Sequence, residues 1–183
     1  WIWESASWLY PGYNRCMVYL SRGEADAVVM REFDLETKQF VEGGFYLSEA
    51  KGWAEWKDEN TLYAMTDFGE GSTTESGYPR LVKRWRRGTP VAAAELVFAG
   101  EVDDVCVWVS SIHTPERQYE FIWRSIGFFE WDVYAVENGE KIKLDLPGDA
   151  KLKHIFKGQA LVHLKSDWTV GNRTYPQGAL ISF

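Results

Sequence analysis

Short segments in which apolar and polar residues alternate recur along the whole chain, and turn-forming residues separate them. Residues 16–20, 27–33 and 39–41 form the first such series. A period of two is the pattern of β-strands, because successive side chains of a strand point to opposite faces of the sheet. Strands this short and this closely spaced favour an antiparallel meander.

The same alternation continues through the rest of the chain. Further strand candidates are residues 61–65, 80–87, 95–98, 119–124, 130–136, 141–144, 160–164 and 178–183. Shorter strand candidates precede each series, at residues 2–3, 53–56, 104–109 and 150–155. The pair Asn138-Gly139 predicts a tight hairpin turn, since both residue types tolerate a positive φ. Residues 90–96 have helical propensity, but we expect a short turn there, followed by a strand.

These segments group into four units of about four strands each, which is the pattern of β-propeller blades. The sequence therefore predicts an all-β fold, a partial or small β-propeller with about four blades of four antiparallel strands. A single propeller segment would span residues 1–183, with blades at 1–47, 48–100, 101–147 and 148–183.

Aromatic residues make up 16% of the chain, and ten of them are tryptophans. Two uses of the tryptophans are open. Large flat side chains can fill the space between neighbouring blades, or an exposed row of them can stack against sugars or peptides. With 45% hydrophobic residues, the chain can bury a substantial core, so general disorder is excluded.

One motif occurs twice and is sharper than the hydrophobic pattern. Thr66-Asp67-Phe68 precedes a polar loop that ends in Tyr78-Pro79-Arg80. Ser166-Asp167-Trp168 precedes a polar loop that ends in Tyr175-Pro176-Gln177. The match indicates an internal duplication.

Two interpretations of these loops remain open. In the first, Asp67 and Asp167 occupy equivalent places after a second strand, where each accepts backbone N–H hydrogen bonds and fixes its loop. In the second, residues of both loops line a surface that binds peptide. The candidate binding residues of this second interpretation are Asp67, Tyr78, Arg80, Asp167 and Trp168.

Charge argues against a nucleic acid as partner, and the lack of a long apolar segment argues against a membrane. The chain has 20 basic and 27 acidic residues, a net charge of -7 and a pI near 5.1. Proteins that bind nucleic acid through its phosphates usually carry the opposite sign, and the one dense basic run, 83–87, is short. No segment approaches the ~18 apolar residues that cross a bilayer. We therefore expect neither a nucleic acid nor a membrane as partner.

The chain begins Trp1-Ile2-Trp3-Glu4, without Met and without the charged-then-apolar pattern of a signal peptide. This start favours a segment of a longer protein, with a cytoplasmic location favoured and a periplasmic one open. Cys16 and Cys106 are too few for a disulfide scaffold, and we expect both to be reduced and half-buried in strands.

Catalytic and metal-binding patterns are missing from the sequence. None of the serines lies in a Gly-x-Ser-x-Gly elbow. His163 alternates with apolar residues and is expected on a strand face, and His113 is expected in a surface loop. Metal-binding spacings such as Cys-x-x-Cys or His-x-His do not occur. We expect no catalytic residue, no metal site and no cofactor in this chain.

Three longer runs carry a resemblance to a known family. They are REFDLETKQFVEGGF at 31–45, TDFGEGSTTESGYPRLVKRWRRGTP at 66–90 and SDWTVGNRTYPQGAL at 166–180. The chain resembles, over essentially its whole length, the bacterial prolyl oligopeptidase family of serine peptidases. The resemblance implies a stretch of an N-terminal β-propeller, which in the family usually has seven blades and caps a separate α/β-hydrolase domain.

The resemblance also implies a function and partners. In the family the propeller gates peptide access, so the implied partners are the α/β-hydrolase domain of the parent chain and a peptide substrate. The catalytic Ser, Asp and His would lie beyond Phe183, so this chain is expected to be non-catalytic.

Two alternatives remain beside that function. A stand-alone propeller of four blades could bind peptide, glycan or protein, and a tryptophan-rich protein could bind glycans. An open half-ring would leave apolar blade faces and strand edges uncovered, so we expect self-association rather than closure of the blades on themselves.

Overall fold

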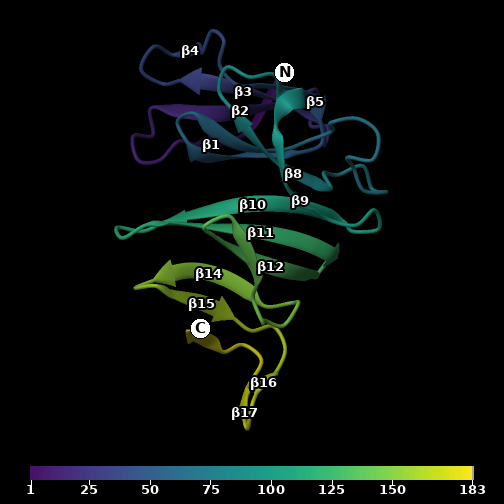
Figure 1. Cartoon of the computed structure of the whole chain (residues 1–183), viewed down its shortest axis with the longest axis vertical. Helices are drawn as coiled ribbons and strands as arrows, with labels where there is room; N and C mark the ends of the chain where they lie inside the picture. Colours follow the sequence, from purple (N-terminus) through teal and green to yellow (C-terminus); the bar gives the residue numbers. More distant parts are fainter. Residues whose placement is uncertain (183) are drawn as a thin grey trace. The chain divides into compact units, whose positions relative to one another are not determined.

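The structure, a computed structural model, describes residues 1–182 and consists almost entirely of antiparallel β-strands (Figure 1). Within this range the helical content is one 3₁₀ turn, η1 (Val91–Ala93), in the segment where the sequence predicts a turn before a strand. No helix of these residues is long and apolar enough to cross a membrane. The all-β prediction is confirmed. The chain divides into two compact units, Trp1–Val109 and Ser110–Phe183.

The first sheet is the predicted meander with one additional strand. Its strands β1 (Ile2–Trp8), β2 (Arg15–Ser21), β3 (Val28–Asp34) and β4 (Gln39–Phe40) pair in chain order. The additional strand, β5 (Tyr46–Ala50), pairs with β3 beside β4. The sequence pattern did not predict β5, and β1 extends beyond the expected strand at residues 2–3.

The second sheet belongs to the same unit and has the order β6-β7-β8-β9. Its strands are β6 (Trp53–Asp58), β7 (Thr61–Met65), β8 (Leu81–Arg86) and β9 (Glu95–Ala99). Each corresponds to a strand predicted from alternation. The polar loop 66–80 joins β7 to β8 and therefore lies at one end of this sheet.

The core of the first unit is formed by buried residues of both sheets, together with Leu9 and Phe45 just outside the strands. The buried members of this cluster are Leu9, Met17, Tyr19, Val28, Met30, Phe45, Leu47, Ala54, Trp56, Leu62, Ala64 and Trp85. Polar atoms inside it are paired: the Tyr19 hydroxyl donates to the carbonyl of Ala54 at 2.8 Å and accepts from its N–H at 2.9 Å. Trp56 donates its indole N–H to the carbonyl of Ser7. Tryptophans thus fill the core here, as the first of the two interpretations predicts.

The third sheet has the order β10-β11-β12-β13, and the boundary between the two units falls within β10 (Cys106–His113). The other strands are β11 (Gln118–Gly127), β12 (Glu130–Glu137) and β13 (Glu140–Lys143). Asn138 and Gly139 have φ angles of 51° and 85°, which confirms the predicted hairpin turn. His113 is the half-buried last residue of β10, so its prediction as a surface-loop residue is wrong.

The fourth series differs from the predicted four-stranded sheet. Strands β14 (Lys151–Phe156), β15 (Gln159–His163) and β18 (Leu180–Ser182) form a three-stranded sheet. The loop before β18 contains a separate hairpin of β16 (Trp168–Val170) and β17 (Arg173–Tyr175). Phe183, the last residue of the predicted strand 178–183, lies outside the described residues. The predicted blade boundaries stay a prediction.

Candidate functional site

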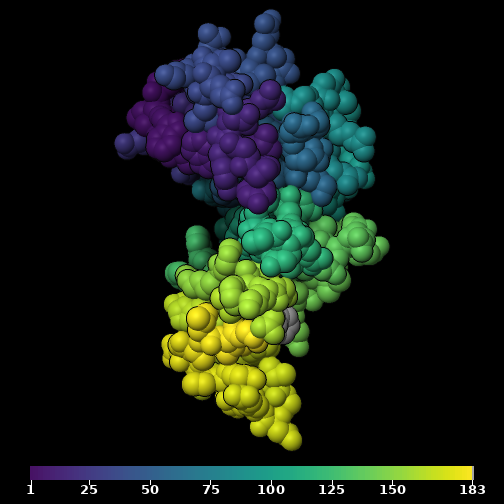
Figure 2. Space-filling view, turned by 90° about the vertical axis from the view of Figure 1, so that its left-hand side faces the viewer, coloured from purple at the N-terminus to yellow at the C-terminus, as the bar shows by residue number. Residues whose placement is uncertain are grey.

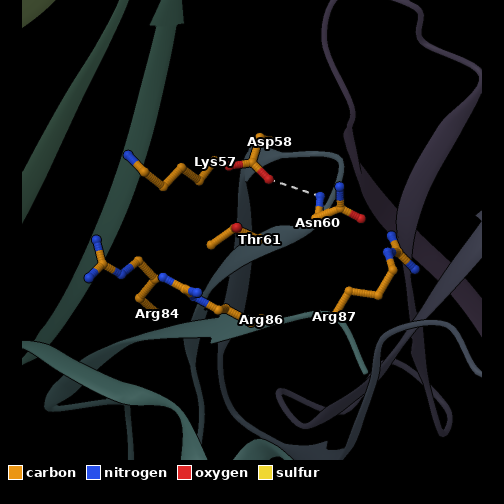
Figure 3. Close-up of a pocket in the computed structure, with 7 residues that line it drawn as sticks. All are labelled: Lys57, Asp58, Asn60, Thr61, Arg84, Arg86 and Arg87. Carbon is orange, nitrogen blue, oxygen red and sulfur yellow. Dashed lines mark hydrogen bonds between the residues drawn. The ribbon is translucent and has the colours of Figure 1, made fainter. Parts of the chain in front are cut away.

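A polar pocket of about 550 Å³ opens at the end of the second sheet where β6 turns into β7 and β8 ends (Figure 3). It is lined entirely by residues of the first unit, most of them basic. The lining residues are Lys57, Asp58, Asn60, Thr61, Arg84, Arg86 and Arg87.

The strand register brings the pocket residues together. Thr61 on the middle strand β7 pairs across the sheet with Arg86, and Tyr63 pairs with Arg84. Because side chains alternate along β8, Arg84 and Arg86 project from the same face, and Figure 3 shows them beside one another. Lys57 is the extra residue of a bulge where the β6–β7 register shifts, a feature that redirects a side chain.

Several of these charges already have partners. Arg84 donates to Glu95 at 2.6 Å, and this hydrogen bond and charge lower the pKa of the Glu95 carboxyl. Lys57 donates to the hydroxyl of Tyr63 at 3.3 Å. Figure 3 shows Arg87 on the far side of the pocket from Arg84, and its guanidinium binds the carboxylate of Glu32.

The basic run 83–87 was expected to lie in the strand 80–87 and is too short to indicate nucleic-acid binding, and nothing in the sequence predicted this pocket. The alternation of Arg84 and Arg86 along one strand was a signal that could have placed them on one face. Lys57 gave no such signal, because its place depends on the bulge in β6.

The predicted binding residue Asp67 lies two positions after β7 and organises the loop 66–80. Its Oδ1 accepts the N–H of Gly69 at 2.7 Å and the hydroxyl of Ser72 at 3.1 Å. Ser72 is 2% exposed, and its hydroxyl also accepts the N–H of Phe68. The acceptor role predicted for Asp67 is therefore present.

Tyr78 and Arg80, at the far end of the same loop, are both engaged in internal contacts. The Tyr78 ring stacks on Trp53 with centroids 5.8 Å apart, and the Lys51 ammonium lies 4.3 Å from the Tyr78 ring centre. The Arg80 guanidinium donates to the carbonyl of Gly71 through two nitrogens and to the carbonyl of Gly100 through the third, at 3.0 Å. Arg80 thereby ties the loop to the end of β9.

The remaining two predicted binding residues, Asp167 and Trp168, lie in the second unit. Asp167 follows β15, and its Oδ1 accepts the N–H of Gln177 at 2.7 Å. Trp168 begins β16 and packs on Tyr175 of β17, with ring centroids 6.2 Å apart.

Each Asp follows the second strand of its sheet and accepts a backbone N–H. The structure brings Asp67, Tyr78 and Arg80 into one loop and Asp167 and Trp168 into another. The spatial equivalence of the two Asp positions and the peptide-binding role of the five residues stay predictions.

An apolar groove of about 290 Å³ lies on the face of the first sheet that points away from the core. Trp3 and Trp8 stand at this groove with 63% and 47% of their surfaces exposed. The lining residues are Trp3, Ala6, Trp8, Cys16, Val18, Phe33, Leu35 and Phe40. Some tryptophans of this chain are therefore exposed, in contrast to Trp56 and Trp85 of the core.

The histidines and cysteines form no shared site. Burial lowers the pKa of His113, while burial and the charges of Lys165, Lys153 and Lys151 lower the pKa of His163, which lies on β15 as predicted. Cys16 and Cys106 are free thiols, and Cys16 is buried. No group of three or more His, Cys, Asp or Glu in the described part of the chain could hold a metal ion.

Comparison with known proteins gives clear relatives, although no protein-family model matches the chain. An uncharacterized peptidase of Sinorhizobium fredii is 36% identical over 190 residues, an alignment that covers 100% of this chain and 26% of the relative.

Solved structures match as well. That of a post-proline cleaving enzyme from Rickettsia typhi matches with a TM-score of 0.89 and 26% identity, over 97% of this chain and 28% of that chain. A structure from a study of two prolyl endopeptidases matches with a TM-score of 0.68 and 18% identity, over 88% of this chain and 24% of that chain. This second likeness shows the fold alone.

The chain thus spans about a quarter of the length of the proteins it matches. The four-stranded antiparallel sheets have the composition expected of propeller blades, and the predicted propeller architecture is confirmed. With a peptidase as its sequence relative and a post-proline cleaving enzyme as a structural match over nearly its whole length, the chain resembles a β-propeller portion of prolyl oligopeptidase-like peptidases.

Proposed function

We propose that this chain is an accessory, non-catalytic propeller portion of a serine peptidase whose reaction takes place in a separate α/β-hydrolase domain. The observation that carries the proposal is the structural match over 97% of this chain to only 28% of a post-proline cleaving enzyme. The missing Gly-x-Ser-x-Gly elbow agrees with it.

The proposed lack of catalytic activity is tested directly on the purified chain. Purified protein should not hydrolyse chromogenic peptides that contain proline. Turnover that copurifies with the chain and disappears when one of its own serines is changed to Ala would overturn the proposal. Turnover that survives every such substitution indicates a contaminating enzyme and leaves the chain non-catalytic.

The proposed partner is an α/β-hydrolase domain in the same polypeptide, and the proposed role is to gate the access of peptides to it. The complete reading frame tests the partner, since a frame without a hydrolase segment would contradict it. The gating role predicts that the complete polypeptide cleaves short proline-containing peptides and spares folded proteins with exposed proline loops. Equal rates on both substrates would contradict gating.

A substitution of Arg80, one of the five candidate binding residues, can distinguish a role in holding the loop 66–80 from a role in peptide binding. If Arg80 serves to hold the loop 66–80, Arg80→Ala should raise protease cleavage in this loop, because the carbonyls of Gly71 and Gly100 lose their donor. If it serves peptide binding, the same substitution should weaken peptide hydrolysis by the complete polypeptide without raising loop cleavage.

We also propose that the chain of 183 residues self-associates through the apolar groove of the first sheet, with a second copy as occupant. Trp3 and Trp8 give this face large exposed apolar surfaces, and Figure 2 shows the N-terminal residues, in purple, as a continuous part of the surface of the first unit. Specific interfaces bury about 800 Å² on each partner, and aromatic residues are enriched in them.

A further inference from the structure

The pocket of Figure 3 presents a hydroxyl and two guanidinium groups from neighbouring strands. Thr61 and Arg86 are cross-strand partners, and Arg84 lies two residues before Arg86 on the same face of β8. Their common position does not depend on flexible loops, because the hydrogen-bonded ladder between β7 and β8 sets it.

Arg86 differs from the other cations of the pocket. Its side chain is exposed and makes no hydrogen bond or ion pair with any of residues 1–182. The hydroxyl of Thr61 likewise has no partner within that range. Both groups therefore keep their hydrogen-bonding capacity for a ligand, while the charge of Arg86 also contributes to lowering the pKa of Glu95.

The surrounding charges favour an anion. Four cationic side chains and one carboxylate, that of Asp58, line the pocket, although the whole chain carries a net charge of -7. Asp58 accepts the N–H of Asn60, and this bond orients its carboxylate within the turn. Glu95 and Glu32 pair with Arg84 and Arg87, and the charges around the pocket still sum to a net positive value, to which Arg86 contributes.

We propose that this pocket binds an oxyanion, a carboxylate or phosphate group, with the Arg86 guanidinium and the Thr61 hydroxyl as its direct ligands. The planar fork of a guanidinium matches two oxygens of such a group, and charge-assisted hydrogen bonds are the stronger class. Lys57 and Arg84 complete the basic lining of the pocket around Thr61. The site is independent of the proposed accessory function.

Titration of the wild-type chain by NMR tests the site. Inorganic phosphate and acetate are added in separate series, each against sodium chloride of equal ionic strength. Saturable shifts of the Thr61 amide and the Arg86 side-chain N–H are expected in at least one series. Saturation by phosphate alone would identify a phosphate group as the ligand. Saturation by acetate alone, or by both anions, would show that the site also accepts a carboxylate. Shifts that follow ionic strength alone, or none at all, would overturn the site.

Substitutions identify the ligands. Arg86→Ala should weaken binding about tenfold, because a charge-assisted hydrogen bond is lost, and Thr61→Val should weaken it less. Arg173→Ala removes an equal charge from an exposed position in the second unit and should leave binding unchanged. Equal losses in Arg86→Ala and Arg173→Ala would overturn the assignment. Arg86→Lys keeps the charge and removes the fork, so it should weaken binding to an intermediate degree and provides a second test if Arg86→Ala folds poorly.

Discussion

The guanidinium of Arg87 donates two hydrogen bonds to the carboxylate of Glu32, at 2.7 and 2.9 Å, and the Glu32 side chain has no exposed surface. Glu32 lies on β3 of the first sheet, and Arg87 directly follows β8 of the second. The same carboxylate accepts the N–H of Phe45 at 2.9 Å and lies 3.5 Å from Arg15. Burial of a lone carboxylate is very costly, so these donors are what allow the charge to remain inside the unit.

Arg87→Ala should lower the free energy of unfolding by about 3 kcal/mol, because it leaves Glu32 buried without its main counter-charge. Urea unfolding followed by tryptophan fluorescence measures the change. Adding Glu32→Gln to Arg87→Ala should recover part of the loss, since the buried charge is then removed.

Arg22→Ala is the matched control for that experiment. Arg22 pairs with Glu49 at 3.1 Å, but its side chain is 68% exposed. The loss should stay below about 1 kcal/mol, because water screens an exposed ion pair. A similar loss in Arg22→Ala and Arg87→Ala would contradict the stabilising role given to the buried pair.

Replacing Trp3 and Trp8 together by Ser should shift the chain towards monomer, because the exposed apolar surface of the groove is removed. Sedimentation velocity over a range of concentrations measures the shift. Phe128 and Phe129 are 86% and 82% exposed in the second unit and provide a control pair. If their replacement by Ser dissociates the oligomer and the Trp replacements do not, the interface lies elsewhere.

Cys106 should react slowly with iodoacetamide at pH 8. Burial, with a contribution from the charge of Asp104, raises the pKa of this thiol from 9.0 to about 11. The thiolate is the reactive form, so its fraction at pH 8 falls about a hundredfold relative to a thiol of pKa 9.0, and the rate should rise with pH until about pH 11. A Cys16→Ala background isolates the signal of Cys106. A rate that levels off near pH 9 would contradict the raised pKa.

Gly139→Ala should destabilise the β12–β13 hairpin by about 1 kcal/mol, because a residue with a Cβ is strained at positive φ. Gly139 has a φ of 85°, and an added Cβ would meet no atom within 4 Å, so the cost is conformational. Gly127→Ala is the control, since an added Cβ there makes only an ordinary contact, 3.7 Å from Glu130. Equal unfolding free energies of both variants would show that the turn carries no strain.

Local chemistry explains why so much of the strand order was predictable. Alternation along β2, β3, β7 and β12 is a property of adjacent residues, and the Asn138-Gly139 turn depends on the φ preferences of two residues. Strand β5 and the hairpin β16–β17 escaped prediction, because neither short segment has a pronounced alternation. The repeated motif around Asp67 and Asp167 correctly predicted that each carboxylate accepts a backbone N–H of its own loop.

The sequence by itself determined the all-β class, most of the strands and the turns between them, because each of these follows from residues close together in the chain. Tertiary structure alone decided that Trp56 is buried while Trp3 is exposed. It also decided that Arg87 reaches Glu32, 55 positions away, and that Arg86 stands beside Thr61 at a pocket. These outcomes depend on strand register and on the packing of one sheet against another, which are set by contacts between residues distant in the sequence.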